Sequence, residues 1–183
     1  YKLKRVSGDG NVGLIFQDTN GDVFYNVSYD LFSKFQSNDV RRRPGALIEP
    51  GSTQSNWKVG KYSGPDTDYG LADIKVVRVA EMYLILSEAQ ALKDAPDFTA
   101  AADAINQLRA SRRLTTSALP NLTFSDRAEA IDKILLERRK ELAFEGHRWY
   151  DLVRTGRAQA VMSAFSPNWN SKYELWPIPQ TEI

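Results

Sequence analysis

The chain has 183 residues, of which 42% are apolar and 26% are charged, so it can bury one core and lacks a disordered composition. Its 24 Lys and Arg residues balance 23 Asp and Glu residues, and this balance provides no basic face for nucleic acid. The sequence has no cysteine, which excludes disulfides, thiolate zinc sites and cysteine nucleophiles from this chain.

Residues 1–74 are predicted to form loops with short strands, because Gly, Asn, Asp, Ser and Pro interrupt the apolar runs. The runs 14–16 and 23–27 are rich in strand-forming residues and flank the pair Asn20-Gly21. This arrangement predicts a β-hairpin, since both turn residues tolerate positive φ. The alternating Asp and Asn side chains of 18–22 could also hold calcium, but the glycine and the distal acid of an EF-hand loop are not in their places. We favour the plain turn.

A basic run, 41–43, is followed at once by the turn pair Pro44-Gly45. Three basic residues before such a pair favour a loop over a helix that reads a DNA groove. We therefore expect no nucleic-acid partner.

From residue 75 onward the apolar residues follow a helical period. In 78–93 they recur on one face and occupy much of the other, so this helix is expected to lie between two neighbours. A second helix is predicted over 97–112, with Asp97 as its N-cap. The connection between the two is short, which predicts an antiparallel helical hairpin.

A third helix is predicted to start within 123–126, at a sequence typical of a capping box, and to run to about 145, with Gly146 as its stop. A fourth, shorter helix is predicted over 147–155 and ends at Gly156. We expect a mainly α fold with tetratricopeptide-like helical hairpins in 75–183 and a loop-rich, weakly stranded portion in 1–74. The two portions are expected to form one structural unit.

The run 137–152 combines dense charge with bulky aromatic residues. Glu137, Glu141 and Glu145 follow one another at helical spacing, and pairing with arginine would let them be partly buried as a structural clamp. A glycosidase acid and base is a competing interpretation, but acids among so many basic residues would stay ionised, and a general acid needs a raised pKa. His147 as a base, or His147 with Asp151 as metal ligands, lacks support because the chain has no second histidine.

The same residues carry a family resemblance. Residues 136–154, LERRKELAFEGHRWYDLVR, closely resemble the ERR-x-EL-x-FEG-x-R-W/F-x-DL-x-R signature near the C-terminus of SusD/RagB proteins. Three further stretches resemble motifs of that family in the same order, at 78–89, 105–112 and 176–183. One departure is Ser87, where alanine is more usual. The resemblance covers residues 75–183.

The resemblance implies a non-enzymatic lipoprotein on the outward-facing surface of the outer membrane, with no cofactor and no metal. Such proteins bind a glycan or another nutrient and deliver it to a SusC-like TonB-dependent transporter. Family members are longer and begin with a lipid anchor, so we expect this chain to be a C-terminal piece that meets the membrane only through an anchor outside it. The signature residues are expected to be structural and not ligand contacts: Glu137, Arg138, Glu145, Arg148, Trp149 and Asp151.

Sugar contacts cannot be transferred from the resemblance, so we infer candidates from chemistry. An exposed aromatic ring suits the C–H face of a pyranose, and neighbouring amides and carboxylates suit its hydroxyls. Four rings in loops meet this description: Trp57, Tyr62, Tyr69 and Trp169. The alternative function is a tetratricopeptide-like scaffold that binds a protein partner in place of a sugar.

Overall fold

The computed structural model describes residues 2–3, 12–16, 23–43, 48–49, 58–62, 72–112 and 118–175. The chain divides into two compact units, Tyr1–Phe144 and Glu145–Ile183. The division falls inside the signature run and not at residue 75, where the sequence pattern changes. Each unit is described separately.

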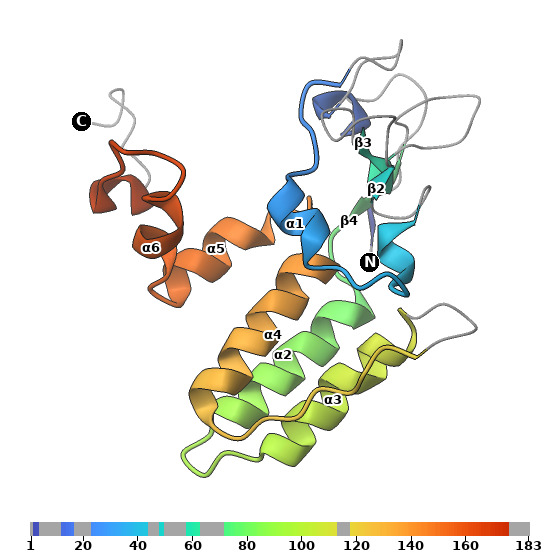
Figure 1. Cartoon of the computed structure of the whole chain (residues 1–183), viewed down its shortest axis with the longest axis vertical. Helices are drawn as coiled ribbons and strands as arrows, with labels where there is room; N and C mark the ends of the chain where they lie inside the picture. The colour runs from blue at the N-terminus through green and yellow to red at the C-terminus, as the bar shows by residue number, and fades with distance from the viewer. Residues whose placement is uncertain are drawn as a thin grey trace. The chain divides into compact units, whose positions relative to one another are not determined.

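The described elements at the start of the first unit are short (Figure 1). Its four described strands have two residues each and form two antiparallel pairs. β1 (Lys2–Leu3) pairs with β4 (Ile74–Lys75), and β2 (Ile48–Glu49) pairs with β3 (Lys58–Val59). The helical pieces between them are η1 (Gly13–Ile15), α1 (Tyr29–Ser33), η2 (Val40–Arg42) and η4 (Gly60–Tyr62). This portion is loop-rich and weakly stranded, as predicted.

The two strands predicted at 14–16 and 23–27 are wrong. Residues Gly13–Ile15 form a single 3₁₀ turn, closed by the amide of Phe16 on the carbonyl of Gly13. The amides of Phe24 and Tyr25 both donate to the carbonyl oxygen of Phe16, at 2.8 and 3.2 Å, so the backbone curls at this point in place of extending. The turn predicted at Asn20-Gly21 lies outside the described residues.

Three longer helices form the body of the first unit, α2 (Val79–Leu92), α3 (Phe98–Ala110) and α4 (Arg127–Glu141). α2 lies between the other two and runs antiparallel to α3, which confirms the mainly α fold and the first predicted hairpin (Figure 1). Their contact faces bury one core, made of Ala80, Leu84, Ala91, Ala101, Ile105, Leu108, Ala130, Ile134 and Leu142. A second hairpin would pair α4 with a helix of the other unit, and it stays a prediction.

Side-chain caps fix where α3 and α4 begin. The carboxylate of Asp97 accepts a hydrogen bond from the amide of Ala100 at 2.9 Å, as the sequence predicted. At α4 the carboxylate of Asp126 accepts from the amide of Glu129, and the carboxylate of Glu129 reaches back to the amide of Ser125 at 2.7 Å. The helix therefore starts within the predicted region, and its start resembles a capping box in which Glu129 binds the residue before the N-cap.

The end of α4 differs from the prediction. The helix stops at Glu141, because Phe144 takes a positive φ of 65° and Gly146 one of 83°, conformations that no α-helix continues. Gly146 therefore precedes the next helix as its N-cap and does not directly terminate α4. After the helix ends, Ala143 and Phe144 pack in a second small core. Its other members are Val27, Leu31, Phe35, Val59 and Tyr62.

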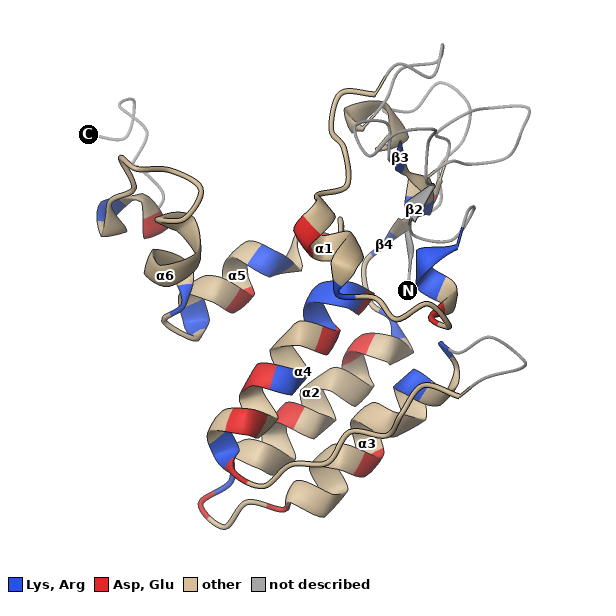
Figure 2. Cartoon of the chain, in the orientation of Figure 1, with Lys and Arg blue, Asp and Glu red and all other residues tan. Residues whose placement is uncertain are grey.

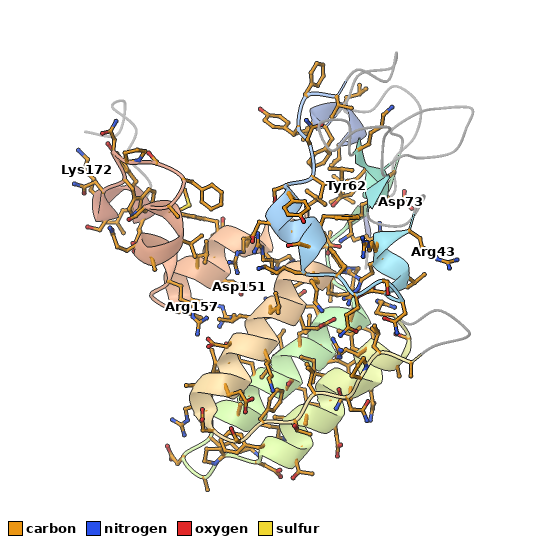
Figure 3. All side chains as sticks on the ribbon, in the orientation of Figure 1. Arg43, Tyr62, Asp73, Asp151, Arg157 and Lys172 are labelled. Atoms are coloured by element: carbon orange, nitrogen blue, oxygen red, sulfur yellow. The ribbon has the colours of Figure 1, made fainter. Side chains whose placement is uncertain are left out.

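The second unit contains α5 (His147–Arg154), α6 (Ala158–Met162) and η5 (Ser171–Glu174). α5 ends as predicted, with Gly156 in the left-handed region at φ 66°. Inside α5, Arg154 donates to the buried carboxylate of Asp151, at 2.9 Å from Nε and 2.7 Å from Nη2. Asp151 and Arg157 are labelled in Figure 3.

Candidate functional site

In the described part of the first unit, buried acidic and basic side chains form a network of ion pairs at the carboxyl end of α4 (Figure 2). We call it the ion-pair cluster. It contains three carboxylates and five cations, namely Asp39, Glu137, Glu141, Arg41, Arg78, Arg109, Arg112 and Lys140.

Glu137 is almost fully enclosed, with 1% of its surface exposed, as is Asp39. Its Oε1 accepts from Arg41 Nη2 at 2.6 Å. Its Oε2 accepts from Arg109 Nη1 at 2.7 Å and lies 2.6 Å from the ammonium of Lys140. The cations that reach this side chain come from η2, α3 and α4 itself.

Glu141 lies one helical turn further on and is also buried. Arg112 forks across it, with Nη2 at 2.8 Å from Oε1 and Nε at 2.9 Å from Oε2. Arg78 donates to Oε1 at 2.9 Å and to the backbone carbonyl of Glu141 at 3.0 Å. Bidentate pairing of this kind fixes orientation as well as charge.

Arg41 links the two glutamates to the loop-rich portion. Its Nη1 lies 2.9 Å from Glu141 Oε2, and its Nε and Nη2 donate to the two oxygens of Asp39 at 2.9 and 2.7 Å. The guanidinium also lies over the ring of Phe35, 5.6 Å from its centroid. One side chain thus joins three carboxylates.

The electrostatics of the cluster keep the carboxylates ionised. Burial opposes the charged form of Glu137, but Arg41, Lys140 and Arg109 outweigh it and lower its pKa from 4.5 to about 2. Burial likewise opposes ionisation of Glu141, and its pKa is nevertheless lowered, through hydrogen bonding and attraction from Arg112 and attraction from Arg41. The pKa of Arg41 is raised, because its contacts with Asp39 and Glu137 outweigh burial.

These shifts limit what the cluster can do chemically. A general acid needs a carboxyl group that holds its proton near neutral pH, and Glu137 and Glu141 have the opposite tendency. Their oxygens already accept hydrogen bonds from arginine and lysine, so a ligand would have to displace those partners. The arrangement therefore suits a structural joint between η2, α2, α3 and α4.

The remaining signature residues are placed as follows. Arg138 is buried on α4, with its guanidinium 4.0 Å from Glu81 on α2. Asp151 is buried on α5. Glu145, Arg148 and Trp149 are half-buried in the second unit. Their structural role remains a prediction.

The four predicted ligand rings fare differently. Trp57 and Tyr69 lie outside the described residues. Tyr62, labelled in Figure 3, does not present the exposed ring that we expected: 4% of it is exposed, its hydroxyl donates to the carbonyl of Phe144 at 3.1 Å, and it stacks on Phe16. The reason is the apolar surface created where the chain leaves α4, which this ring covers.

Trp169 lies in an aromatic cluster of the second unit. Its ring meets Trp149 edge to face at 5.8 Å and Tyr173 at 5.7 Å between centroids. Its indole nitrogen is buried and has no hydrogen-bond partner in the described part of the chain. The most exposed ring of this cluster is Tyr173, at 54%, which the sequence analysis did not single out.

Sequence reasoning also missed the partners of the glutamates. Arg41 was assigned to a loop, and Arg78, Arg109 and Arg112 were not considered as ligands of Glu137 or Glu141. One signal was available: Arg109 falls on the apolar stripe of its helix, one position after the buried Leu108. A charge at an inward position predicts a buried partner.

Among the described residues, no group of three His, Asp or Glu side chains could hold a metal ion. No helix in that part of the chain is long and apolar enough to cross a membrane.

Comparison with known proteins gives consistent results. The sequence pattern that defines the SusD family matches residues 53–183. A curated relative, SusD-like protein P38 of Formosa agariphila, is 27% identical over 168 residues, which cover 90% of this chain and 31% of the relative. SusD-like protein P25 of the same organism is 29% identical over 177 residues, which cover 90% of this chain and 33% of that relative. The chain thus spans about a third of the length of these curated relatives.

Solved structures resemble the chain in fold. A laminarin-binding SusD-like protein aligns with a TM-score of 0.64 at 27% identity, covering 86% of this chain and 35% of that one. A SusD-like carbohydrate-binding protein from Bacteroides vulgatus aligns with a TM-score of 0.56 at 30% identity, covering 72% of this chain and 27% of the other.

Proposed function

The chain belongs to the SusD family, and from that premise we propose that the intact protein containing it binds a glycan at the cell surface without cleaving it. We further propose that it delivers the glycan to a SusC-like TonB-dependent transporter in the outer membrane. The chain itself supplies a helical scaffold and part of the aromatic surface.

The observation that carries the non-catalytic part of the proposal is the pairing of Glu137 and Glu141. Hydrolysis of a glycosidic bond needs a protonated carboxyl group beside the leaving oxygen and a second carboxyl group for water or the sugar. The pKa of Glu137 is about 2, and that of Glu141 is also lowered, so neither holds a proton at neutral pH. This supports binding without turnover.

The glycan ligand is supported by the family and by the aromatic residues of the second unit. The similar solved proteins are described as carbohydrate-binding and laminarin-binding. Laminarin is therefore the first ligand to test here. Trp57, Tyr69 and Trp169 remain our candidate contacts, and we add Tyr173 because its ring is exposed beside Trp169.

The transporter partner and the outer-membrane location rest on family membership. Co-purification of the intact protein with a SusC-like protein from its own cells would support delivery. Recovery of the intact protein free of any such transporter, from membranes that contain both, would contradict that part of the proposal.

The experiment for glycan binding is isothermal titration of the intact protein with laminarin and a panel of other oligosaccharides. We expect saturable binding of at least one. Absence of binding across a broad panel, with the protein shown to be folded, would contradict the proposal.

One observation favours the alternative of a protein-binding scaffold. α2 leaves apolar side chains exposed along one face, including Val79, Met82 and Leu86. Exposed apolar stripes on a helix are typical of protein contacts. The variants Met82→Glu and Leu86→Glu separate the two functions, since they should abolish a protein contact through this face and leave glycan affinity unchanged.

A further inference from the structure

A cavity of about 250 Å³ lies between α3 and the segment 121–124 that leads into α4. It contains none of the residues of the ion-pair cluster and none of the predicted ligand rings. Its lining includes two aromatic rings and four polar side chains, which are Phe98, Phe124, Thr99, Asp103, Asn121 and Thr123.

The walls of this cavity are held by the fold. The side-chain amide of Asn106 on α3 donates to the carbonyl of Leu122 at 2.9 Å and accepts from the amide of Leu122 at 2.8 Å. Lys133 on α4 donates to the carbonyl of Thr123 at 2.9 Å. Leu122 and both phenylalanine rings pack against the helical core. The cavity is therefore preformed, and a ligand would not have to order its walls.

Four polar side chains of the lining are available to bind a ligand. Thr99, Asp103, Asn121 and Thr123 are exposed, and their side chains make no hydrogen bond or ion pair with any other described residue. Asn106, by contrast, uses both polar atoms on Leu122. Two hydroxyls, one carboxylate and one amide thus stand around the opening with donors and acceptors to offer.

This combination selects one class of ligand. A purely apolar molecule would cover four polar side chains without pairing them, and an anion would be repelled by Asp103. A pyranose has an apolar C–H face for the rings and hydroxyls for the carboxylate and the amide. The volume lies below the range of about 300 to 1,000 Å³ typical of sites for drug-sized ligands, so it suits a single sugar ring.

We propose that this cavity is a second saccharide subsite, which binds one ring of a neutral glycan over Phe98 and Phe124 with its hydroxyls on Asp103 and Asn121. The inference deepens the proposed function and rests on it. A ligand of about a dozen heavy atoms binds with an affinity of about millimolar. The subsite would act chiefly by holding a chain already bound elsewhere on the protein.

The absence of cysteine from this chain allows a direct test. Thr99→Cys, in the intact protein, places the only thiol of this chain at the cavity. Its rate of alkylation by a maleimide is read on the peptide that carries residue 99, in increasing glucose, galactose or xylose. Ala89→Cys, on the exposed side of α2, is the control. We expect at least one sugar to slow alkylation of the Thr99→Cys thiol about twofold when half the cavities are filled, with no change for Ala89→Cys.

Adding Asp103→Ala to Thr99→Cys should remove that protection, because the hydroxyls lose their acceptor. Thr123→Cys serves as a second reporter from the opposite wall. The proposal is overturned if no sugar protects either thiol, if Ala89→Cys is protected equally, or if Asp103→Ala leaves protection intact. Titration of the unsubstituted protein with oligosaccharides separates the two hypotheses. If the protein binds an oligosaccharide but no sugar protects the thiols, only the subsite proposal is contradicted. If the protein binds no oligosaccharide, the proposed function is contradicted.

Discussion

Arg41 and Glu137 lie 96 positions apart in the sequence, and the Nη2 of Arg41 lies 2.6 Å from the Oε1 of Glu137. Both side chains are almost fully buried. This pair ties the loop-rich portion of the first unit to α4 of the same unit.

Arg41→Ala should lower the free energy of unfolding by about 3 to 5 kcal/mol, because it removes the cation that three buried carboxylates share. Urea denaturation followed by circular dichroism measures the change. Arg43→Ala is the matched control, since Arg43 is exposed two positions away and should change stability by less than about 0.5 kcal/mol. Equal effects of the two substitutions would show that the cluster does not stabilise the fold.

Stability should fall as the pH is lowered from about 5 towards 2. The pKa of Glu137 in the folded protein is about 2, below its ordinary value of 4.5, so its contribution is present above pH 4.5 and is lost as the pH approaches 2. A shift of this size corresponds to about 3 kcal/mol. The measurement is the urea midpoint as a function of pH.

Glu137→Gln should flatten that pH dependence as well as destabilise the protein, because the amide does not titrate. Glu129→Gln on the same helix is the control. The partners of Glu129, Lys133 and Ser125, lie at the surface, where solvent screens the interaction, so this variant should leave most of the slope. An unchanged slope in Glu137→Gln would contradict the assignment.

Trp149→Ala should destabilise the second unit by about 2 kcal/mol or more, since it removes a ring packed against Trp169. Near-ultraviolet circular dichroism during thermal unfolding follows the loss. Tyr150→Ala is the control, because Tyr150 is 63% exposed. Should Trp149→Ala melt like the parent and lose its glycan, Trp149 would be a ligand contact and the structural role would be wrong.

Trp57→Ala should weaken glycan binding while the melting temperature stays nearly unchanged, as expected for an exposed platform. Tyr62→Ala should do the reverse, since its ring lies in a core and truncation leaves a cavity worth about 3 to 5 kcal/mol. Titration and melting curves on both variants test the contrast. If Trp57→Ala destabilises the protein, Trp57 is a core residue and not part of the binding surface.

Much of the helical part was predictable because its signals are local. The Asp97 cap, the start of α4 within 123–126 and the stop at Gly156 depend on residues within about one helical turn, and the structure reproduces each of them. The end of α4 was not predictable in the same way. It depends on the positive φ of Phe144, a conformation that side chains avoid and that the surrounding core must enforce.

The partners of the buried glutamates escaped prediction for a related reason. The density of charge around Glu137 and Glu141 indicated arginine pairing, but the choice of Arg41 and Arg112 depends on tertiary contacts across 96 and 29 positions. Helices α1 and α6 were missed because each has five residues, too few to establish a period.

The proposed binding of a glycan without cleavage can be tested by measuring hydrolysis. The intact protein is incubated with an oligosaccharide that it binds in titration, and new reducing ends are counted over time. We predict none above a sample without protein. Reducing ends that accumulate with the wild-type protein, and disappear with a folded Glu137→Gln variant, would contradict the account.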